Sequence, residues 1–215
     1  MNDQDMTHED PDDRPWRPAA SGRSFVYVFP RPGEDLLKLG MSRDPLARMQ
    51  ALHPRWYEFF DLDAGWIVAT DRVREARALE LRLSRSLDGL RAPAPLTVAH
   101  AAGGATEWYR GAGSRLDSEA DSLLSLGYTV QRPLRHWLLP AVREQAPLLF
   151  DWGEKILGEL ESLGPAGPVL SPLEWRLRNA LDALPALGIG LDRTVSPRVL
   201  AWHAESSRRL GLAAG

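Results

Sequence analysis

Hydrophobic residues in the first half of the chain fall into short runs that predict β-strands. Residues 24–29 (SFVYVF), 36–41 (LLKLGM) and 65–70 (GWIVAT) are apolar and rich in β-branched or aromatic side chains, which favour extended structure. The turn-forming segment 30–35 (PRPGED) separates the first two runs. We therefore predict an antiparallel hairpin followed by a third strand.

Other segments have apolar residues three or four positions apart, the spacing of amphipathic helices. Ser42 or Asp44 is expected to cap the first helix, with Pro45 in its first turn and its end near Leu52. The pattern also predicts helices at 71–87 and 114–126, a short helical stretch opening at 106–109, a loop at 89–106, and either a strand or an extension at 128–131.

The residue pattern in the second half of the chain is typical of a helical region. One or two helices are predicted within 138–163, and two more at 172–184 and 196–210, after a Gly- and Pro-rich linker at 164–168. The predicted fold class is α+β, with a small three-stranded antiparallel sheet flanked by helices and followed by a mostly helical part. The predicted domains are a disordered acidic tail at 1–22, a first domain at 23–135 and a helical domain at 136–215.

Composition and charge exclude several classes of protein. The chain has no cysteine, which excludes disulfides, zinc–thiolate sites and cysteine nucleophiles and favours a cytoplasmic location. We expect no membrane partner, because no apolar run approaches the ~18 residues of a membrane span. The net charge is −3, of which −4 lies in residues 1–22, +2 in 23–110 and −1 in 111–215. The body is therefore nearly neutral, and non-specific DNA affinity from charge alone should be modest.

Chemistry-bearing residues occur in a suggestive order: Tyr27 in the first strand, Lys38 and Gly40 in the second, Arg48 on the helix that follows, and Glu107 much later. Each has an ordinary structural explanation. Tyr27 suits a packed strand, Lys38 an edge strand and Gly40 a strand end. Arg48 is typical of a surface charge, and Glu107 of a carboxylate in the first turn of a helix. Together they form a set suited to metal-assisted cleavage of a phosphodiester.

This joint pattern resembles the GIY-YIG nuclease superfamily, in particular its phage-type branch, whose second motif reads lysine–hydrophobic–glycine. The resemblance covers roughly residues 24–110. It is carried by Val26-Tyr27-Val28, by Lys38-Leu39-Gly40-Met41-Ser42, by the arginine helix at 43–52, by a second helix at 80–87 and by Glu107-Trp108-Tyr109.

The resemblance implies a DNA endonuclease that uses one divalent cation, Mg²⁺ or Mn²⁺. It makes Glu107 the metal ligand, Arg48 the group that steadies phosphate charge, and Tyr27 the general base or the residue that positions the water. Lys38 joins this catalytic set, either lowering the pKa of the phenol or contacting phosphate. The motif also assigns Gly40, Ser42 and Arg43 to the substrate-binding side of the site.

Two positions depart from the superfamily pattern. Lys38 stands where the second motif usually has a tyrosine, and Ser84 stands near a position where relatives often have histidine. Glu80 falls on the apolar stripe of its helix, where a carboxylate needs a partner; it either pairs with an arginine or orients the site.

The alternative is therefore a catalytically inactive module of the same fold that binds nucleic acid or a protein. A third possibility is that the C-terminal helices dominate, as an interaction domain for self-association or for a protein partner in a mobile-element or phage-defence system.

Overall fold

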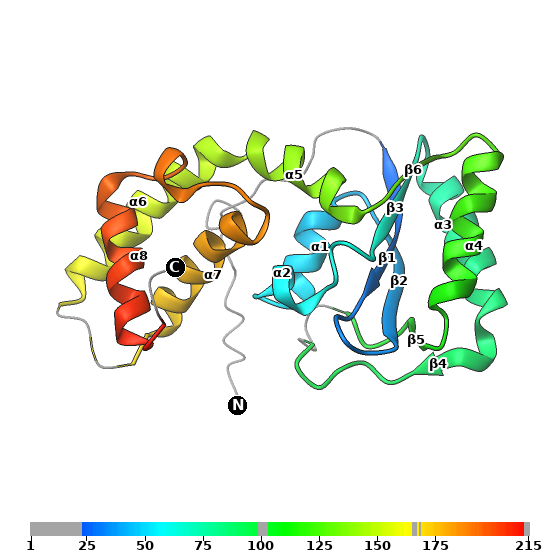
Figure 1. The fold of residues 1–215 in the computed structure, drawn as a ribbon, viewed down its shortest axis with the longest axis horizontal. Helices are drawn as coiled ribbons and strands as arrows, with labels where there is room; N and C mark the ends of the chain where they lie inside the picture. The colour runs from blue at the N-terminus through cyan, green and yellow to red at the C-terminus, as the bar shows by residue number, and fades with distance from the viewer. Residues whose placement is uncertain (1–22, 99–102, 165–166, 168, 213–215) are drawn as a thin grey trace, which may run out of the picture. The chain divides into compact units, whose positions relative to one another are not determined.

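The computed structural model describes residues 23–98, 103–164, 167 and 169–212 (Figure 1). The prediction of a disordered tail at 1–22 lies outside the described residues. Within the described ranges, no helix is both long enough and apolar enough to cross a membrane.

The described residues divide into two compact units. One comprises 23–144 together with 182–189, and the other comprises 145–181 and 190–212. The sequence-based boundary between 135 and 136 falls inside a helix, α5 (Leu134–Glu144), all of which belongs to the first unit. The first unit holds the sheet and every candidate site residue.

The first unit is built on a six-stranded antiparallel sheet in the order β4-β5-β2-β1-β3-β6. The α+β class is as predicted, but the prediction of three strands is wrong. The three predicted strands form the centre of the sheet, and two- or three-residue strands extend it on both sides. The strands are β1 (Ser24–Pro30), β2 (Leu36–Ser42), β3 (Trp66–Thr70), β4 (Arg91–Ala92), β5 (Trp108–Arg110) and β6 (Thr129–Gln131).

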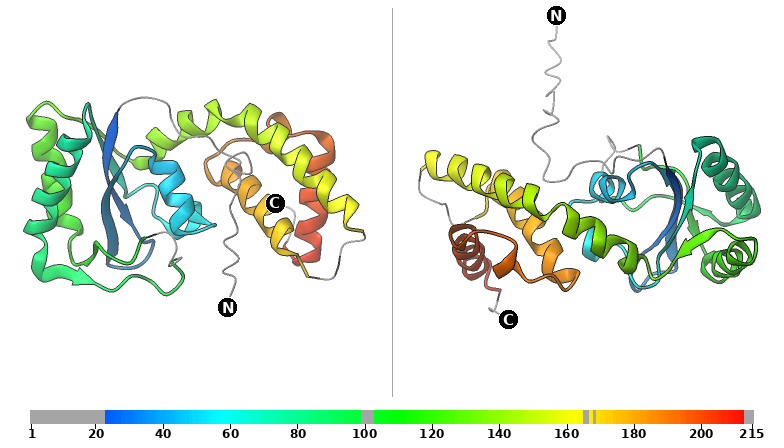
Figure 2. Two further views of the ribbon diagram at one scale, coloured as in Figure 1. Left: turned by 180° about the vertical axis from the view of Figure 1, so that it is seen from behind. Right: turned by 90° about the horizontal axis from the view of Figure 1, so that it is seen from above.

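Helices cover both faces of this sheet (Figure 1). On one face, α3 (Val73–Ser86) and α4 (Gly113–Ser125) pack against Val26, Val28 and Leu39; Figure 2 shows these two helices side by side from two further directions. The other face carries α1 (Pro45–Leu52) and α2 (Trp56–Phe59). Burial on both faces explains why β1 is apolar throughout instead of alternating.

The register of the hairpin decides which residues meet. Tyr27 lies opposite Gly40, and Phe29 lies opposite Lys38. Lys38 in turn lies opposite Trp108 of β5. Lys38 is therefore not on an edge strand, because β2 is paired on both sides.

The predicted helical stretch at 106–109 is wrong, because these residues lead into strand β5. Trp108 and Tyr109 are both fully buried, and the indole nitrogen of Trp108 donates to the Gly104 carbonyl at 2.7 Å. The sequence Glu-Trp-Tyr is too short to show a period of its own, and pairing with β2 decides its conformation.

Four helices form the C-terminal part, where helices are predicted, although the first of them begins at Leu134, before the predicted range of 138–163. They are α5, α6 (Ala146–Ser162), α7 (Pro172–Ala186) and α8 (Pro197–Arg209). A buried polar network joins α7 to α8: Glu174 pairs with Arg209, and the Arg178 guanidinium donates to Ser206 at 2.7 Å. These contacts all lie inside the second unit.

Asp44 is the residue that starts α1, the helix that carries Arg48. Its carboxylate accepts a hydrogen bond from the Ala47 backbone N–H at 2.9 Å, and Pro45 occupies the first turn. We expect Asp44→Ala to lower the free energy of unfolding by about 1 kcal/mol, because it leaves that N–H without its cap. Urea denaturation followed by circular dichroism measures the change.

The neighbouring exposed residue provides the control for this prediction. Arg43→Ala should change the stability by less than about 0.5 kcal/mol, as surface substitutions usually do. Equal stability of Asp44→Ala and wild type would show that the cap contributes nothing to this helix.

Candidate active site

The predicted catalytic residues come together at one place beside the central hairpin. Tyr27 comes from β1, Lys38 from β2, Arg48 from α1 and Glu107 from the turn before β5, and Glu80 of α3 joins them. The charges of Arg48, Glu80 and Glu107 all influence both the Tyr27 phenol and the Lys38 ammonium. Residues 80 positions apart in the sequence therefore share one electrostatic environment.

Tyr27 lies flat across Gly40. An added Cβ at Gly40 would lie 2.4 Å from the phenol oxygen and 2.7 Å from Cζ of the same ring, so only glycine leaves room for the ring at this register. The ring also stacks on Phe29, with centroids 4.0 Å apart. Gly40 is itself buried, so its role in this geometry is to seat the phenol.

Arg48 is the cation that contacts the phenol. Its Nε donates to the Tyr27 hydroxyl at 3.3 Å, and Nη2 donates to the Gly103 carbonyl at 3.3 Å. The buried residues Leu46 and Met49 anchor the helix that carries it. The guanidinium is half-buried, and its planar fork suits phosphate oxygens.

Burial raises the pKa of the Tyr27 phenol to about 12, although the Arg48 guanidinium acts in the opposite direction. A phenol with this pKa is almost entirely protonated at neutral pH. The pKa of Tyr27 therefore lies above its ordinary value and not below it. Of the two roles implied for Tyr27, positioning the water fits better than general base.

Lys38 is fully buried, with no exposed side-chain surface. Its ammonium nitrogen donates to the Thr106 carbonyl at 2.8 Å, to the Glu107 carboxylate at 3.1 Å and to the Leu39 carbonyl at 3.2 Å. An ammonium has three N–H groups, and three acceptors surround it. Burial lowers the pKa of Lys38 from its ordinary value, while the Glu107 carboxylate acts to raise it.

Glu107 occupies an unusual backbone conformation. Its φ is 63°, in the left-handed region that non-glycine residues seldom adopt, and its carbonyl accepts from the Leu39 N–H at 3.1 Å. Its side chain is 37% exposed, so the carboxylate reaches solvent while its backbone is tied to β2. The sequence places this residue at a helix start; the structure places it in a turn.

Glu80 is a second carboxylate at the site. It is half-buried on α3, next to the buried Leu79, and the backbone N–H of Met41 hydrogen-bonds to it. Burial raises the pKa of Glu80, and the charge of Glu107 raises it further. Of the two readings open from the sequence, an orienting role in the site fits this position better than a structural ion pair with an arginine.

The other motif residues have structural contacts. Ser84, where relatives often have histidine, lies 2.6 Å from the buried Tyr109 hydroxyl. Ser42 accepts from the Asp44 N–H at 3.0 Å and so shapes the turn into α1. Arg43 is exposed in that turn.

The oxygen donors of the site fit a hard divalent cation. Within the described ranges, no group of three or more His, Cys, Asp or Glu side chains could hold a metal ion. Mg²⁺ is nevertheless commonly held by one or two carboxylates with waters and substrate phosphate completing its shell. The exposed carboxylate of Glu107, with Glu80 nearby, meets that requirement.

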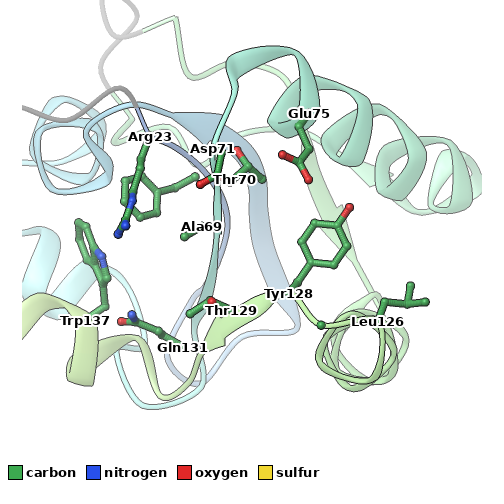
Figure 3. A pocket seen from close by; sticks show the side chains of 12 residues that line it. Arg23, Ala69, Thr70, Asp71, Glu75, Leu126, Tyr128, Thr129, Gln131 and Trp137 are labelled. Atoms are coloured by element: carbon green, nitrogen blue, oxygen red, sulfur yellow. The ribbon is translucent and has the colours of Figure 1, made fainter.

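A separate pocket lies at the β6 edge of the sheet, where β3 pairs with β6 (Figure 3). It has a volume of about 510 Å³, and its lining includes Arg23, Phe25, Tyr128, Gln131 and Trp137. None of the residues predicted to form the active site lines it. The candidate active site is therefore distinct from this pocket.

Comparisons of the chain with protein-family models, with curated proteins and with solved structures give no match. The assignment of a function therefore depends on the residues and their geometry.

The contact between Tyr27 and Gly40 can be tested directly. We expect Gly40→Ala to destabilise the protein by roughly 1–3 kcal/mol, since the added methyl group overlaps the phenol ring. Urea denaturation measures this, and Gly113→Ala, where a Cβ meets nothing within 4 Å, is the matched control. In a Tyr27→Ala background the cost of Gly40→Ala should largely vanish; an equal cost there would contradict the proposed clash.

The raised pKa of Tyr27 predicts a dependence of stability on alkaline pH. The unfolded phenol loses its proton near pH 10 and the folded phenol near pH 12, so folding is favoured below pH 10 and this contribution is lost as pH rises to about 12. The contribution is at most roughly 2–3 kcal/mol. The difference in unfolding free energy between wild type and Tyr27→Phe, measured at pH 8 and pH 11, should therefore shrink; a constant difference would rule out the raised pKa.

Proposed function

We propose that this protein is a metal-dependent DNA endonuclease of the GIY-YIG type, with its active site at Tyr27, Arg48, Glu80 and Glu107. The observation that carries the proposal is the contact set itself. The phenol touches a guanidinium, a carboxylate in a left-handed turn reaches solvent beside them, and a second carboxylate lies near. These groups come from distant segments of the chain, and three of them, Tyr27, Arg48 and Glu107, are residues that the sequence resemblance assigns to the site.

Each side chain has a distinct task in this proposal. The Arg48 guanidinium stabilises the phosphate charge that builds up in the transition state. Glu107, the exposed carboxylate, holds the divalent cation, either Mg²⁺ or Mn²⁺. When bound, such a cation polarises a phosphoryl oxygen and stabilises the leaving oxygen.

Hydrolysis requires a group that accepts a proton from the attacking water. Water oxygen adds to phosphorus, a P–O ester bond breaks, the water gives up a proton and the leaving oxygen takes one up. The phenol of Tyr27, protonated at neutral pH, can hydrogen-bond the attacking water and orient it. Glu80 is the stronger candidate to accept the proton, because a raised carboxyl pKa makes it a better base than an ordinary glutamate.

A second candidate function is a nucleic-acid- or protein-binding module without activity. The specific observations in its favour are the nearly neutral charge of the body of the chain and Lys38 at the position where the second motif usually has a tyrosine. In either case we propose that DNA contacts involve the exposed Arg43, and that the C-terminal helices provide a surface for self-association or a protein partner. The cytoplasmic location stays a prediction from the absence of cysteine.

Replacing the proposed metal ligand tests the endonuclease function. Glu107→Gln keeps the size of the side chain and removes its charge, and should lower metal-dependent nicking by at least about 100-fold. Supercoiled plasmid and branched DNA are incubated with Mg²⁺, Mn²⁺ or EDTA, and nicked product is quantified. Glu34→Gln, at an exposed position in the β1–β2 turn, is the control.

Two outcomes of this assay would reject the endonuclease. Unchanged nicking by Glu107→Gln would show that the cleavage does not use this site. A wild-type protein that binds DNA but does not nick it with either metal would favour the binding module.

A further inference from the structure

We propose that Lys38 is a positioning residue: its buried ammonium holds Glu107 in the turn before β5 and does not contact DNA. This inference rests on the proposed function, since it concerns the residue that would hold the cation. It also differs from both roles that the sequence motif suggests for this lysine, which are to contact phosphate or to lower the pKa of the phenol.

The surroundings of the ammonium leave it no route to a substrate. The Lys38 side chain has no exposed surface, and its three N–H groups meet the Thr106 carbonyl, the Leu39 carbonyl and the Glu107 carboxylate. A phosphate contact would require an exposed N–H, and it would have to replace an acceptor already at 2.8–3.2 Å.

The same contacts clamp one short segment of backbone. Lys38 binds the carbonyl that precedes Glu107 and the carboxylate of Glu107 itself, while the Leu39 N–H binds the Glu107 carbonyl. Lys38 and Leu39, two consecutive residues of β2, therefore both bind Glu107, whose φ is 63°. A left-handed non-glycine conformation persists only when its surroundings determine it, and these contacts supply that determination.

A buried ammonium suits this task better than a neutral side chain. It satisfies two backbone carbonyls and one carboxylate at the same time, because it has three donors and no acceptor. The carboxylate partner also offsets the cost of burying the charge. The Glu107 side chain, 37% exposed, is thereby held at the surface with its backbone fixed.

The first test uses the wild-type protein and the fact that Lys38 and Lys155 are its only lysines. Native protein is treated with an amine-acylating reagent, sulfo-NHS-acetate, and the two sites are quantified by peptide mass spectrometry over time. Lys155 is exposed on α6 and should react quickly, while Lys38 should stay unmodified until the protein is denatured. Comparable rates at the two lysines would show an accessible ammonium and overturn the proposal.

The second test separates positioning from DNA contact. Lys38→Met should leave metal-free DNA affinity and its salt dependence unchanged, whereas a lysine that contacts phosphate would reduce the salt slope by about 1 when removed. The nicking rate at saturating DNA should fall by about 10–100-fold, the usual loss when the support of a metal ligand is removed. In a Glu107→Gln background the same substitution should cause no further loss. Weaker metal-free binding, unchanged nicking, or a full additional loss in that background would each overturn the inference.

Hydrogen exchange measures the contact between Leu39 and Glu107 independently of nuclease activity. In Lys38→Met, and in Lys38→Gln as a milder variant, the Leu39 amide should exchange at least ten times faster, because its acceptor is the Glu107 carbonyl. The amides of Val26 and Val28 in the central strand should be unaffected, which excludes general destabilisation. Unchanged exchange at Leu39 would reject the clamp, whereas failure of the wild type to nick DNA would reject the proposed function and leave this measurement valid.

Discussion

The pairing of β1 with β2 is the constraint on which the site depends. Its register places Tyr27 against Gly40, where the missing side chain makes room for the phenol, and places Lys38 beside Phe29 and opposite Trp108. A shift of one residue would turn each of these side chains to the other face of the sheet. Because both faces are covered by helices, such a shift would also bury the wrong set of groups, and the register is strongly specified.

The ionisable groups at the site divide into a buried pair and a pair that reaches the surface. Tyr27 and Lys38 are almost completely buried, whereas Arg48 and Glu107 reach the surface. The inner pair fixes the geometry of the outer pair: the phenol receives the Arg48 Nε, and the ammonium binds the Glu107 carboxylate. Groups held in this way lose little further freedom when they bind a charged ligand, which is the condition for electrostatic catalysis.

Burial also changes what each group can do. It makes the phenol a weaker acid and the Glu80 carboxylate a stronger base than in water, as expected when a charged form loses its solvation. Within the proposed nuclease, the chemical role of each group depends on how deeply it is buried as well as on its residue type. This favours proton transfer to a carboxylate, with the phenol as a hydrogen-bond donor.

By itself the sequence determined the α+β class, the three central strands, the helices that follow them and the identity of Tyr27, Arg48 and Glu107 as candidates, because these depend on local periodicity and motif order. Only the tertiary structure decided the strands of two or three residues, which are too short to carry a period, and the turn at Glu107, which pairing with β2 imposes. It also decided the burial and the hydrogen-bond partners of Lys38 and Glu80. Burial and hydrogen-bond partners change the chemistry of an ionisable group, and contacts between residues 69 positions apart, such as Lys38 and Glu107, leave no trace in local sequence.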